Sequence, residues 1–288
     1  MDARYRGARG ADLRHRNPSR SYESAGQSVT GKVLRACLDL VLPAPCLACS
    51  APAQPKGIGL CPACRGLLKG APESCCTGCG RPLPPGPSPD QSSTEILAEG
   101  VGGRLCGGCR RRPEPFQGHL WRWVYGPPLD AVVAGLKFGR LDYLGFRLGE
   151  ELARHLGPRL QGFDAVVPVP LHPWRRWRRG YDQARLIALP LAGALGIPAV
   201  DLLRRRRATA PQSRLGRKGR RENLTGAFAV RRPRRVRGLR ILLVDDVVTS
   251  GATVEAASRC LRAASASAVT VVSVARTPDA QASNGAGF

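Results

Sequence analysis

The sequence lacks any apolar stretch that approaches the ~20 residues needed to cross a membrane, although 43% of its 288 residues are hydrophobic. Its first residues, 1–32, are rich in arginine, glycine and serine and have no apolar core of the kind found in a secretory signal. We therefore expect a folded cytoplasmic protein with no membrane span. Residues 1–34 have little to bury, which predicts a disordered N-terminal extension.

Acidic residues are scarce: 21 Asp and Glu accompany 45 Lys and Arg, giving a formal net charge of +24. Between Arg204 and Arg240, fourteen Arg and one Lys accompany a single acid, Glu222. An arginine-biased composition in solvated loops explains part of this excess. The sharper interpretation is an anion-binding surface for phosphates or nucleic acid. Few aromatic residues interleave with these arginines, so the stretch is not typical of a protein that stacks the bases of single strands.

Cysteine, by contrast, is abundant, and eight of the 11 cysteines form four C-x2-C pairs. These pairs are Cys46/Cys49, Cys61/Cys64, Cys76/Cys79 and Cys106/Cys109. Each pair directs two thiolates at one tetrahedral ion, so four pairs predict two structural Zn²⁺ sites. Sequential pairing is the simplest arrangement, and a cross-braced arrangement is the alternative. A disulfide-stapled secreted module would require an export signal, which the sequence lacks.

The remaining cysteines and most of the histidines are not assigned a function. Cys75 does not keep the two-residue spacing to Cys79, and Cys37 and Cys260 are expected to be small core residues. No histidine stands out as a general base. We expect surface or packing roles for three isolated ones, His119, His155 and His172.

Downstream of the cysteines, strand-like and helix-like patterns alternate. Apolar runs predict buried strands over 164–170, 241–246 and 267–276, and helical periodicity predicts helices over 181–195 and 252–266. Gly196 is a plausible helix stop, and Pro190 is an irregularity that would kink or split the first of these helices. Unbroken apolar strands that alternate with helices predict a parallel sheet covered on both faces.

One strand end carries a candidate anion site. Residues 241–253 read ILLVDDVVTSGAT, an apolar run that ends on Asp245 and Asp246 before a loop of hydroxyl and small residues. A strand, the loop at its carboxyl end and the next helix N-terminus form the usual phosphate site of open α/β sheets. The two carboxylates repel each other, so we expect them to bind vicinal ribose hydroxyls rather than to stabilise the fold. A helix cap would account for one acid but not for both.

Several segments, taken in order, resemble the ComF family, whose members join zinc-finger cysteines to a type I phosphoribosyltransferase domain. Residues 241–253 resemble the motif with which such domains bind phosphoribosyl pyrophosphate (PRPP). The other similar segments are the C-x2-C pairs, LKFGR (136–140), VVPVPL (166–171), RRGYDQA (178–184) and the basic stretch 204–228. Tyr181 and Asp182 stand where Phe and Asn are common in the family, and Ser250 stands where a second Thr is common.

The resemblance implies an α/β fold of the type I phosphoribosyltransferase kind, a parallel sheet flanked by helices over residues 116–288, after a zinc-binding domain over residues 35–115. It implies that Asp245 and Asp246 contact the ribose hydroxyls of PRPP. The implied 5′-phosphate site is Thr249, Ser250, Gly251, Ala252 and Thr253, and the implied pyrophosphate contacts are Arg178, Arg179 and Gly180. A mobile basic loop over 204–226 would close over the substrate, with Mg²⁺ bridging the pyrophosphate and the ribose hydroxyls.

Two hypotheses of function follow. In the first, the chain is a phosphoribosyltransferase acting on an acceptor that the sequence does not identify. In the second, it is a non-catalytic zinc-containing adaptor in natural transformation, with which the family is associated, and its partners are single-stranded DNA or DNA-processing proteins. The intact aspartate pair and phosphate loop favour a working PRPP site, whereas the zinc domain and the basic stretch favour contacts with macromolecules.

Overall fold

A computed structural model describes a large part of the chain. The described residues are 44–54, 57–84, 96–97 (backbone only), 103–206, 224 and 226–278. The predicted extension 1–34, Cys37 and most of the predicted mobile loop 204–226 lie outside the described residues.

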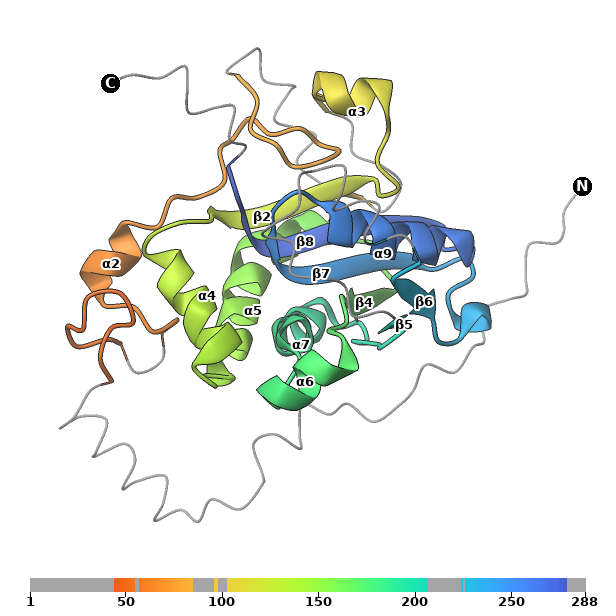
Figure 1. The fold of residues 1–288 in the computed structure, drawn as a ribbon. Coiled ribbons are helices and arrows are strands. Elements are labelled where there is room, and N and C mark those ends of the chain that lie inside the picture. Colours follow the sequence, from red (N-terminus) through yellow and green to blue (C-terminus); the bar gives the residue numbers. More distant parts are fainter. Residues whose placement is uncertain are drawn as a thin grey trace, which may run out of the picture.

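A four-stranded sheet lies at the centre of the molecule (Figure 1). Its strand order is β2–β8–β7–β4, and every neighbouring pair is parallel. The strands are β2 (Gly118–Val124), β4 (Ala165–Pro168), β7 (Arg240–Val248) and β8 (Ala268–Arg276). All nine residues of β8 are buried, as in a strand that is covered on both faces. The prediction of a parallel sheet is confirmed.

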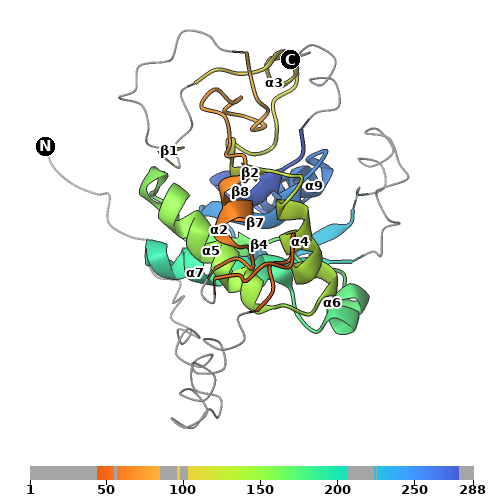
Figure 2. The same cartoon turned by 90° about the vertical axis from the view of Figure 1, so that its left-hand side faces the viewer.

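Helices cover both faces of this sheet, as the alternating side chains of β7 show. Leu242 and Val244 belong to the hydrophobic cluster that includes three helices, whereas Ile241 and Leu243 belong to the cluster that includes a fourth. The first three are α4 (Leu129–Phe138), α5 (Tyr143–Leu156) and α7 (Gln183–Leu195), and the fourth is α9 (Ala252–Ala263). Figure 2 shows the same arrangement turned by 90°.

The helix α7 is continuous through Pro190, so the proline does not split it. The Asp182 side chain caps its first turn, and Gly196 ends it in the left-handed region at φ 66°. Gly149 of α5 packs closely against this helix, since a Cβ at that position would lie 2.3 Å from the carbonyl oxygen of Ile187. The close approach of α5 to α7 therefore requires a glycine.

Two short helices, α2 (Pro62–Gly66) and α3 (Gly107–Arg111), belong to the cysteine-rich region. The segment that follows α2 runs along the free edge of β2, where the backbone N–H of Val124 donates to Lys69 O at 2.8 Å. The backbone N–H of Ala71 donates to Arg122 O at 2.9 Å. This segment therefore covers the edge of the sheet.

Smaller elements complete the described residues. The strands β1 (Ile96–Leu97) and β3 (Leu160–Gln161) pair in parallel, and β5 (Leu203–Arg205) and β6 (Phe228–Val230) pair antiparallel. Two 3₁₀ turns are η3 (Gly157–Arg159) and η5 (Pro233–Arg235). The β5–β6 pair holds the two ends of the basic stretch side by side. Within the part of the chain that the structure describes, the helices are too short or too polar to cross a bilayer.

Candidate functional site

Asp245 and Asp246 lie near the carboxyl end of β7, at the edge of the sheet where ligands bind in open α/β folds. The strand continues through Val248, so the prediction that it ends on the aspartates was two residues short. β4 is also shorter than its predicted range of 164–170, since it spans Ala165–Pro168. The backbone N–H of Val169 still donates to Val244 O of β7 at 2.8 Å, and residues 169–171 line the site.

The alternation of β7 does not continue regularly past the aspartates, since Val244 and Val247 pack in the cluster with α4, α5 and α7, whereas Leu243 and Val248 pack in the cluster with α9. Both aspartates line the same pocket, and Asp246 also contacts Lys137 of α4 and Gln183 of α7. Neighbours in sequence therefore have different surroundings.

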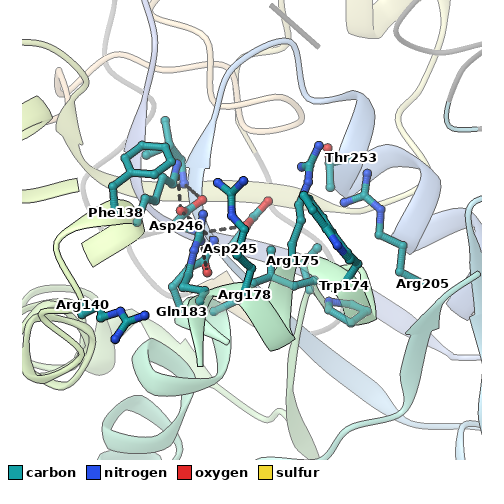
Figure 3. Close-up of a pocket in the computed structure, with 17 residues that line it drawn as sticks. Phe138, Arg140, Trp174, Arg175, Arg178, Gln183, Arg205, Asp245, Asp246 and Thr253 are labelled. Carbon is teal, nitrogen blue, oxygen red and sulfur yellow. Dashed lines mark hydrogen bonds and ion pairs between the residues drawn. The ribbon is translucent and has the colours of Figure 1, made fainter. Parts of the chain in front are cut away.

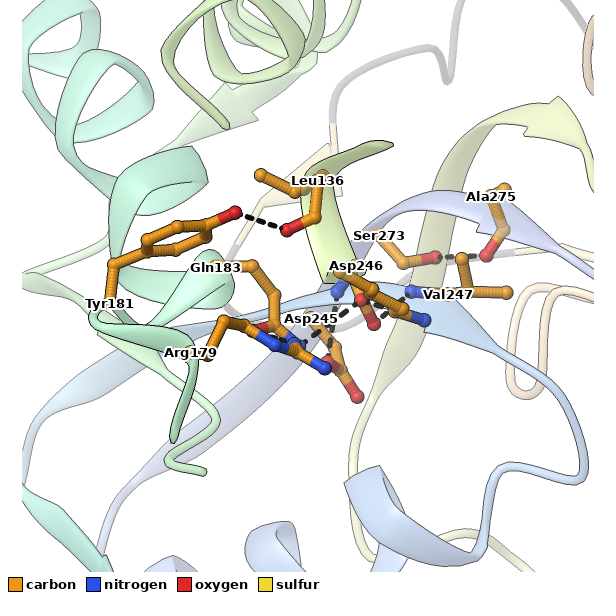
Figure 4. Close-up of polar contacts among 10 residues, drawn as sticks. Leu136, Arg179, Tyr181, Gln183, Asp245, Asp246, Val247, Ser273 and Ala275 are labelled. Atoms are coloured by element: carbon orange, nitrogen blue, oxygen red, sulfur yellow. Dashed lines mark hydrogen bonds and ion pairs between the residues drawn. The ribbon is translucent and has the colours of Figure 1, made fainter. Parts of the chain in front are cut away.

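Asp246 is buried and held by polar groups from two helices (Figure 4). Lys137 Nζ of α4 lies 2.9 Å from Asp246 Oδ2, and the Gln183 amide at the start of α7 donates to the same oxygen at 3.4 Å. The backbone N–H of Val247 donates to Asp246 Oδ1 at 2.7 Å. Burial alone would raise the pKa of Asp246, but Lys137 and these donors outweigh it and hold the pKa below its usual range. These contacts therefore favour the ionised carboxylate form of Asp246.

Asp245 has the opposite electrostatic balance. Burial raises its pKa well above the usual range, and the neighbouring charge of Asp246 raises it further. The backbone N–H of Asp246 donates to Asp245 Oδ1 at 2.9 Å and opposes this only in part. A ligand that donates hydrogen bonds or carries positive charge would favour the carboxylate form of Asp245.

The loop after β7 leads into α9 through Gly251, which has φ 80°. Only glycine adopts this conformation without strain. A Cβ at Gly251 would meet no described atom within 4 Å, so its surroundings are open. The Oγ atom of Ser250 is buried and has no hydrogen-bond partner among the described residues. An open glycine and an unsatisfied hydroxyl at the N-terminus of a 12-residue helix favour an anion at this place.

Across the site lies α6 (Pro173–Arg179), a helix that the sequence patterns did not predict. It begins with a cap in which the His172 ring accepts from Trp174 N at 3.3 Å, and it ends at Gly180 with φ 87°. The Arg179 side chain donates to Gln183 Oε1 and lies 5.7 Å from the centre of the Phe138 ring. These contacts join the end of α6 to α4 and to α7.

Between these elements lies a pocket of about 830 Å³ (Figure 3). It is lined by two carboxylates, Asp245 and Asp246, and by six basic side chains: Lys137, Arg140, Arg175, Arg178, Arg179 and Arg205. Of the residues predicted for ligand binding, the lining includes Arg178, Arg179, Asp245, Asp246 and Thr253. It does not include Gly180, Thr249, Ser250, Gly251 or Ala252. The pocket is strongly basic around an acidic centre.

Sequence reasoning missed several lining residues. Lys137 belongs to the LKFGR segment and Gln183 to the RRGYDQA segment. Both segments were recognised as similar to the family, but neither residue was given a role. Their contact with Asp246 depends on the packing of α4 and α7 against β7, which no local pattern shows. Trp174 and Arg175 belong to α6, the helix that was not predicted. The sequence of this helix, PWRRWRR, is rich in tryptophan and arginine, and this composition was the available signal of a binding site.

The eight paired cysteines form two groups of four, with sequential pairing. Within each group the sulfur atoms lie within 4.8 Å of one another: Cys46, Cys49, Cys61 and Cys64, then Cys76, Cys79, Cys106 and Cys109. Cys49 Sγ and Cys61 Sγ are 3.6 Å apart, and Cys79 Sγ and Cys106 Sγ are 3.8 Å apart. Four sulfurs bound tetrahedrally to Zn²⁺ at ~2.3 Å would be about 3.8 Å apart. Both groups therefore fit structural zinc, and Cys75 belongs to neither.

The two groups are attached to the sheet in different ways. Cys46, Cys61 and Cys64 belong to the same hydrophobic cluster as α4 and α5, whereas the second group forms a small cluster of its own. The second group docks through polar contacts, in which Trp121 Nε1 donates to Gly80 O at 2.7 Å. His119, buried beneath it, contacts Cys79 O at 3.2 Å and Ser273 Oγ at 2.9 Å, which makes it a packing residue as expected.

Comparison with known proteins supports both halves of this description. Residues 37–97 match the double zinc ribbon domain, and residues 182–284 match the phosphoribosyl transferase domain. The zinc ribbon match thus ends before Cys106 and Cys109, which the structure adds to the second group.

The chain is 34% identical over 244 residues to the DNA utilization protein YhgH of Salmonella typhimurium, covering 83% of this chain and 99% of that protein. It is 30% identical over 228 residues to Competence protein F of Haemophilus influenzae, covering 75% and 96%. Among solved structures, the glutamine PRPP amidotransferase from B. subtilis complexed with ADP and GMP is 25% identical with a TM-score of 0.32. That match covers 44% of this chain and 25% of the solved chain.

Proposed function

The chain belongs to the ComF family, which joins a double zinc ribbon to a phosphoribosyltransferase domain, and from this premise we propose that its pocket binds PRPP. The observation that carries the proposal is the pocket of about 830 Å³, in which six basic side chains surround two carboxylates at the carboxyl end of β7. A sugar with a phosphate at one end and a pyrophosphate at the other matches this distribution of charge.

Each part of PRPP has a counterpart in the site. Asp245 and Asp246 accept hydrogen bonds from the ribose 2′- and 3′-hydroxyls, and the loop 249–253 receives the 5′-phosphate. The pyrophosphate lies toward Arg178 and Arg179. The open Gly251 and the unsatisfied Ser250 Oγ support the phosphate end, because each is unexplained by contacts among the described residues. Gly180 acts indirectly, since its positive φ ends α6 and so positions the arginines.

Mg²⁺ fits this site as an ion carried by the ligand. Among the described residues, two carboxylates line the pocket, and Asp246 is already paired with Lys137. This donor set is too small for an all-protein cage, and Mg²⁺ prefers phosphate oxygens and water. When bound, Mg²⁺ would neutralise charge on the pyrophosphate, and Asp245 is the pocket carboxylate for which the described residues supply no cationic partner at hydrogen-bond distance.

Transfer of the phosphoribosyl group to an acceptor is the reaction that this arrangement supports. Charge develops on the leaving pyrophosphate, and preorganised cations that face it lower the barrier. Arg178 and Arg179 extend from α6, where Arg178 lies over the Trp174 ring and Arg179 contacts Gln183 and the Phe138 ring, and these contacts help to orient both side chains. The two hydroxyl contacts hold the sugar in line for displacement at its anomeric carbon.

Calorimetry tests the proposal directly. We expect PRPP with Mg²⁺ to bind wild-type protein, and Asp245→Asn together with Asp246→Asn to weaken binding by about 1.5–3 kcal/mol for each charged hydrogen bond lost. Ribose 5-phosphate and pyrophosphate, titrated separately, should each bind more weakly than PRPP. Binding of PRPP with wild-type affinity to the double variant would refute the ribose contacts. A screen of acceptors for pyrophosphate release would then test turnover.

A second candidate function, an adaptor in DNA handling, is favoured by the net charge of +24 and by the names of relatives, DNA utilization protein and Competence protein F. In this role the affinity for single-stranded DNA should fall steeply as salt is raised, because bound cationic side chains release counterions from the phosphates. Binding that is insensitive to salt would exclude it.

A further inference from the structure

Three exposed aromatic side chains of the described residues lie beside the pocket, and a fourth, Tyr143, is 44% exposed at the start of α5. Phe138 is 73% exposed at the end of α4, and Trp174 and Trp177 of α6 are 57% and 81% exposed. The other two tryptophans, Trp121 and Trp123, are buried in β2. Trp174 and Trp177 are exposed on a helix of seven residues, so their rings do not pack in the core. Large exposed aromatic side chains of this kind indicate a binding surface.

Arginines surround these rings. The helix α6 carries four of them, and Arg178 lies 5.2 Å from the centre of the Trp174 ring. Arg179 lies 5.7 Å from the centre of the Phe138 ring, which places the ends of α4 and α6 side by side. Figure 3 shows Trp174, Arg175 and Arg178 along one side of the pocket. The rings and guanidinium groups of α6 are exposed, whereas Phe228, the single aromatic residue of residues 204–240, is 7% exposed and lies beside Arg205.

We propose that α6 and Phe138, here called the aromatic rim, bind single-stranded nucleic acid by stacking its bases on Trp174 and Trp177 while the arginines contact its phosphates. The inference rests on the second candidate function, and it names the surface and the mode of contact. Stacking on an aromatic ring is possible for every base, so the aromatic rim binds strands with little regard to sequence.

The geometry favours a flexible single strand over a duplex or a membrane surface. In a duplex the faces of the bases are stacked on one another, so they are not available to Trp177. A membrane surface would bury the rings in a plane, but Trp174 and Phe138 also line the concave pocket of about 830 Å³. A chain of phosphates and separate rings can follow both the exposed helix and the pocket edge.

The aromatic rim shares side chains with the pocket, which links the two ligands. Trp174, Arg175 and Arg178 line the pocket and also belong to α6. A pyrophosphate bound by these arginines would occupy the groups that a strand needs. We therefore expect pyrophosphate to compete with single-stranded nucleic acid, whereas Trp177 and Arg176, which do not line the pocket, contribute only to strand binding.

The test uses the full-length protein and a fluorescent oligothymidylate of about 16 nucleotides, near the upper end of single-strand site sizes. Trp177→Ala should weaken binding roughly 5- to 150-fold, the loss expected for one stacked base. Trp177→Phe should retain most of the affinity. Arg176→Ala should reduce the salt dependence by about one counterion. Tryptophan emission should be quenched by the strand in wild-type protein and less in Trp177→Phe, because the tryptophans of β2 are buried.

Leu67→Ala is the matched control, since Leu67 is 66% exposed on another part of the surface and its loss should not change strand affinity. Equal affinity of wild type and Trp177→Ala would overturn the proposal, as would equal binding of a duplex, or binding only to anionic vesicles. PRPP calorimetry on Trp177→Ala keeps the two proposals separate. Normal PRPP binding with unchanged strand binding rejects the aromatic rim alone, and absent PRPP binding in wild type rejects the pocket assignment alone.

Discussion

At the scale of single residues, the surroundings of Asp245 and Asp246 shift their pKa values in opposite directions, although the two residues are adjacent. Asp246 has a cationic partner, Lys137, and a lowered pKa, whereas Asp245 has a raised pKa because it is buried beside another acid. The expectation that neither carboxylate stabilises the fold stays a prediction, and the contact of Asp246 with Lys137 argues against it for that residue. The sequence showed the pair, but the position of Lys137 beside Asp246 was needed to separate the two.

Asp245→Asn should raise the stability of the unliganded protein. The folded protein holds the Asp245 proton more tightly than the unfolded chain does, so ionisation costs stability as pH rises above about 4, the usual aspartate range. The melting temperature of the variant should exceed that of wild type by a few degrees at neutral pH, and the difference should grow as the pH rises above about 4 until it passes the raised folded-state pKa. Circular dichroism melts would measure it.

Asp201→Asn serves as the control for this series, because Asp201 forms an exposed ion pair with Arg185 and its loss should change stability by less than about 0.5 kcal/mol. A lower melting temperature for Asp245→Asn at every pH would contradict the account of its raised pKa.

Asp246→Asn should lower stability by about 1–3 kcal/mol, because it leaves the partly buried Lys137 ammonium without its charged partner. Lys137→Met should have a similar cost, since it leaves the Asp246 carboxylate buried and unpaired. The double variant should lose less than the sum of the two, and urea denaturation would measure this coupling. Losses that add within about 0.5 kcal/mol would show that the ion pair is not important.

At the scale of elements, the junction between β7 and α9 depends on backbone conformation. Gly251→Ala should cost about 1–2 kcal/mol of stability, since an L-residue is strained at φ 80° even though no described atom would clash with the new Cβ. It should also weaken binding of the ligand phosphate, which approaches the same backbone.

Gly193→Ala is the comparison for this prediction. Gly193 lies in α7 with open space at its Cβ position, so alanine there should be neutral or stabilising by up to about 1 kcal/mol. If the two alanine variants have equal stability, the left-handed conformation of Gly251 is not the reason for the glycine.

The two cysteine groups should differ in what their loss does. Purified reduced protein should contain about two Zn²⁺ per chain, because eight cysteines form two tetrahedral sets. Cys61→Ser should unfold much of the protein, since the first group is part of the cluster that includes α4 and α5. Cys106→Ser should release one zinc and leave PRPP binding largely intact, because the second group has its own small cluster.

Zinc content by mass spectrometry and PRPP calorimetry on both serine variants would check these outcomes. Equal damage by the two substitutions would contradict the different attachment of the two groups. In both Figure 1 and Figure 2, α3, which carries Cys109, and α6 lie at opposite ends of the molecule. This separation is the reason to expect that the second zinc does not contribute directly to the ligand site.

At the scale of the whole molecule, the sequence predicted the parallel sheet, the cysteine pairs and the strand that carries the aspartates. These features depend on local patterns: apolar runs for β7 and β8, and two-residue spacing for the cysteines. It did not predict α6, whose seven residues are too few and too charged to show helical periodicity. Nor did it predict the Lys137–Asp246 ion pair, which arises from packing between segments far apart in the chain. Site residues on distant elements were thus the hardest to find.

The central claim is that the pocket at the carboxyl end of β7 binds PRPP with its two phosphate ends apart. A crystal structure of the protein with PRPP and Mg²⁺ tests this most directly. The account predicts the 5′-phosphate at residues 249–253, the ribose hydroxyls at Asp245 and Asp246, and the pyrophosphate beside Arg178 and Arg179. A ligand bound elsewhere, or in the opposite orientation with its pyrophosphate at residues 249–253, would contradict it.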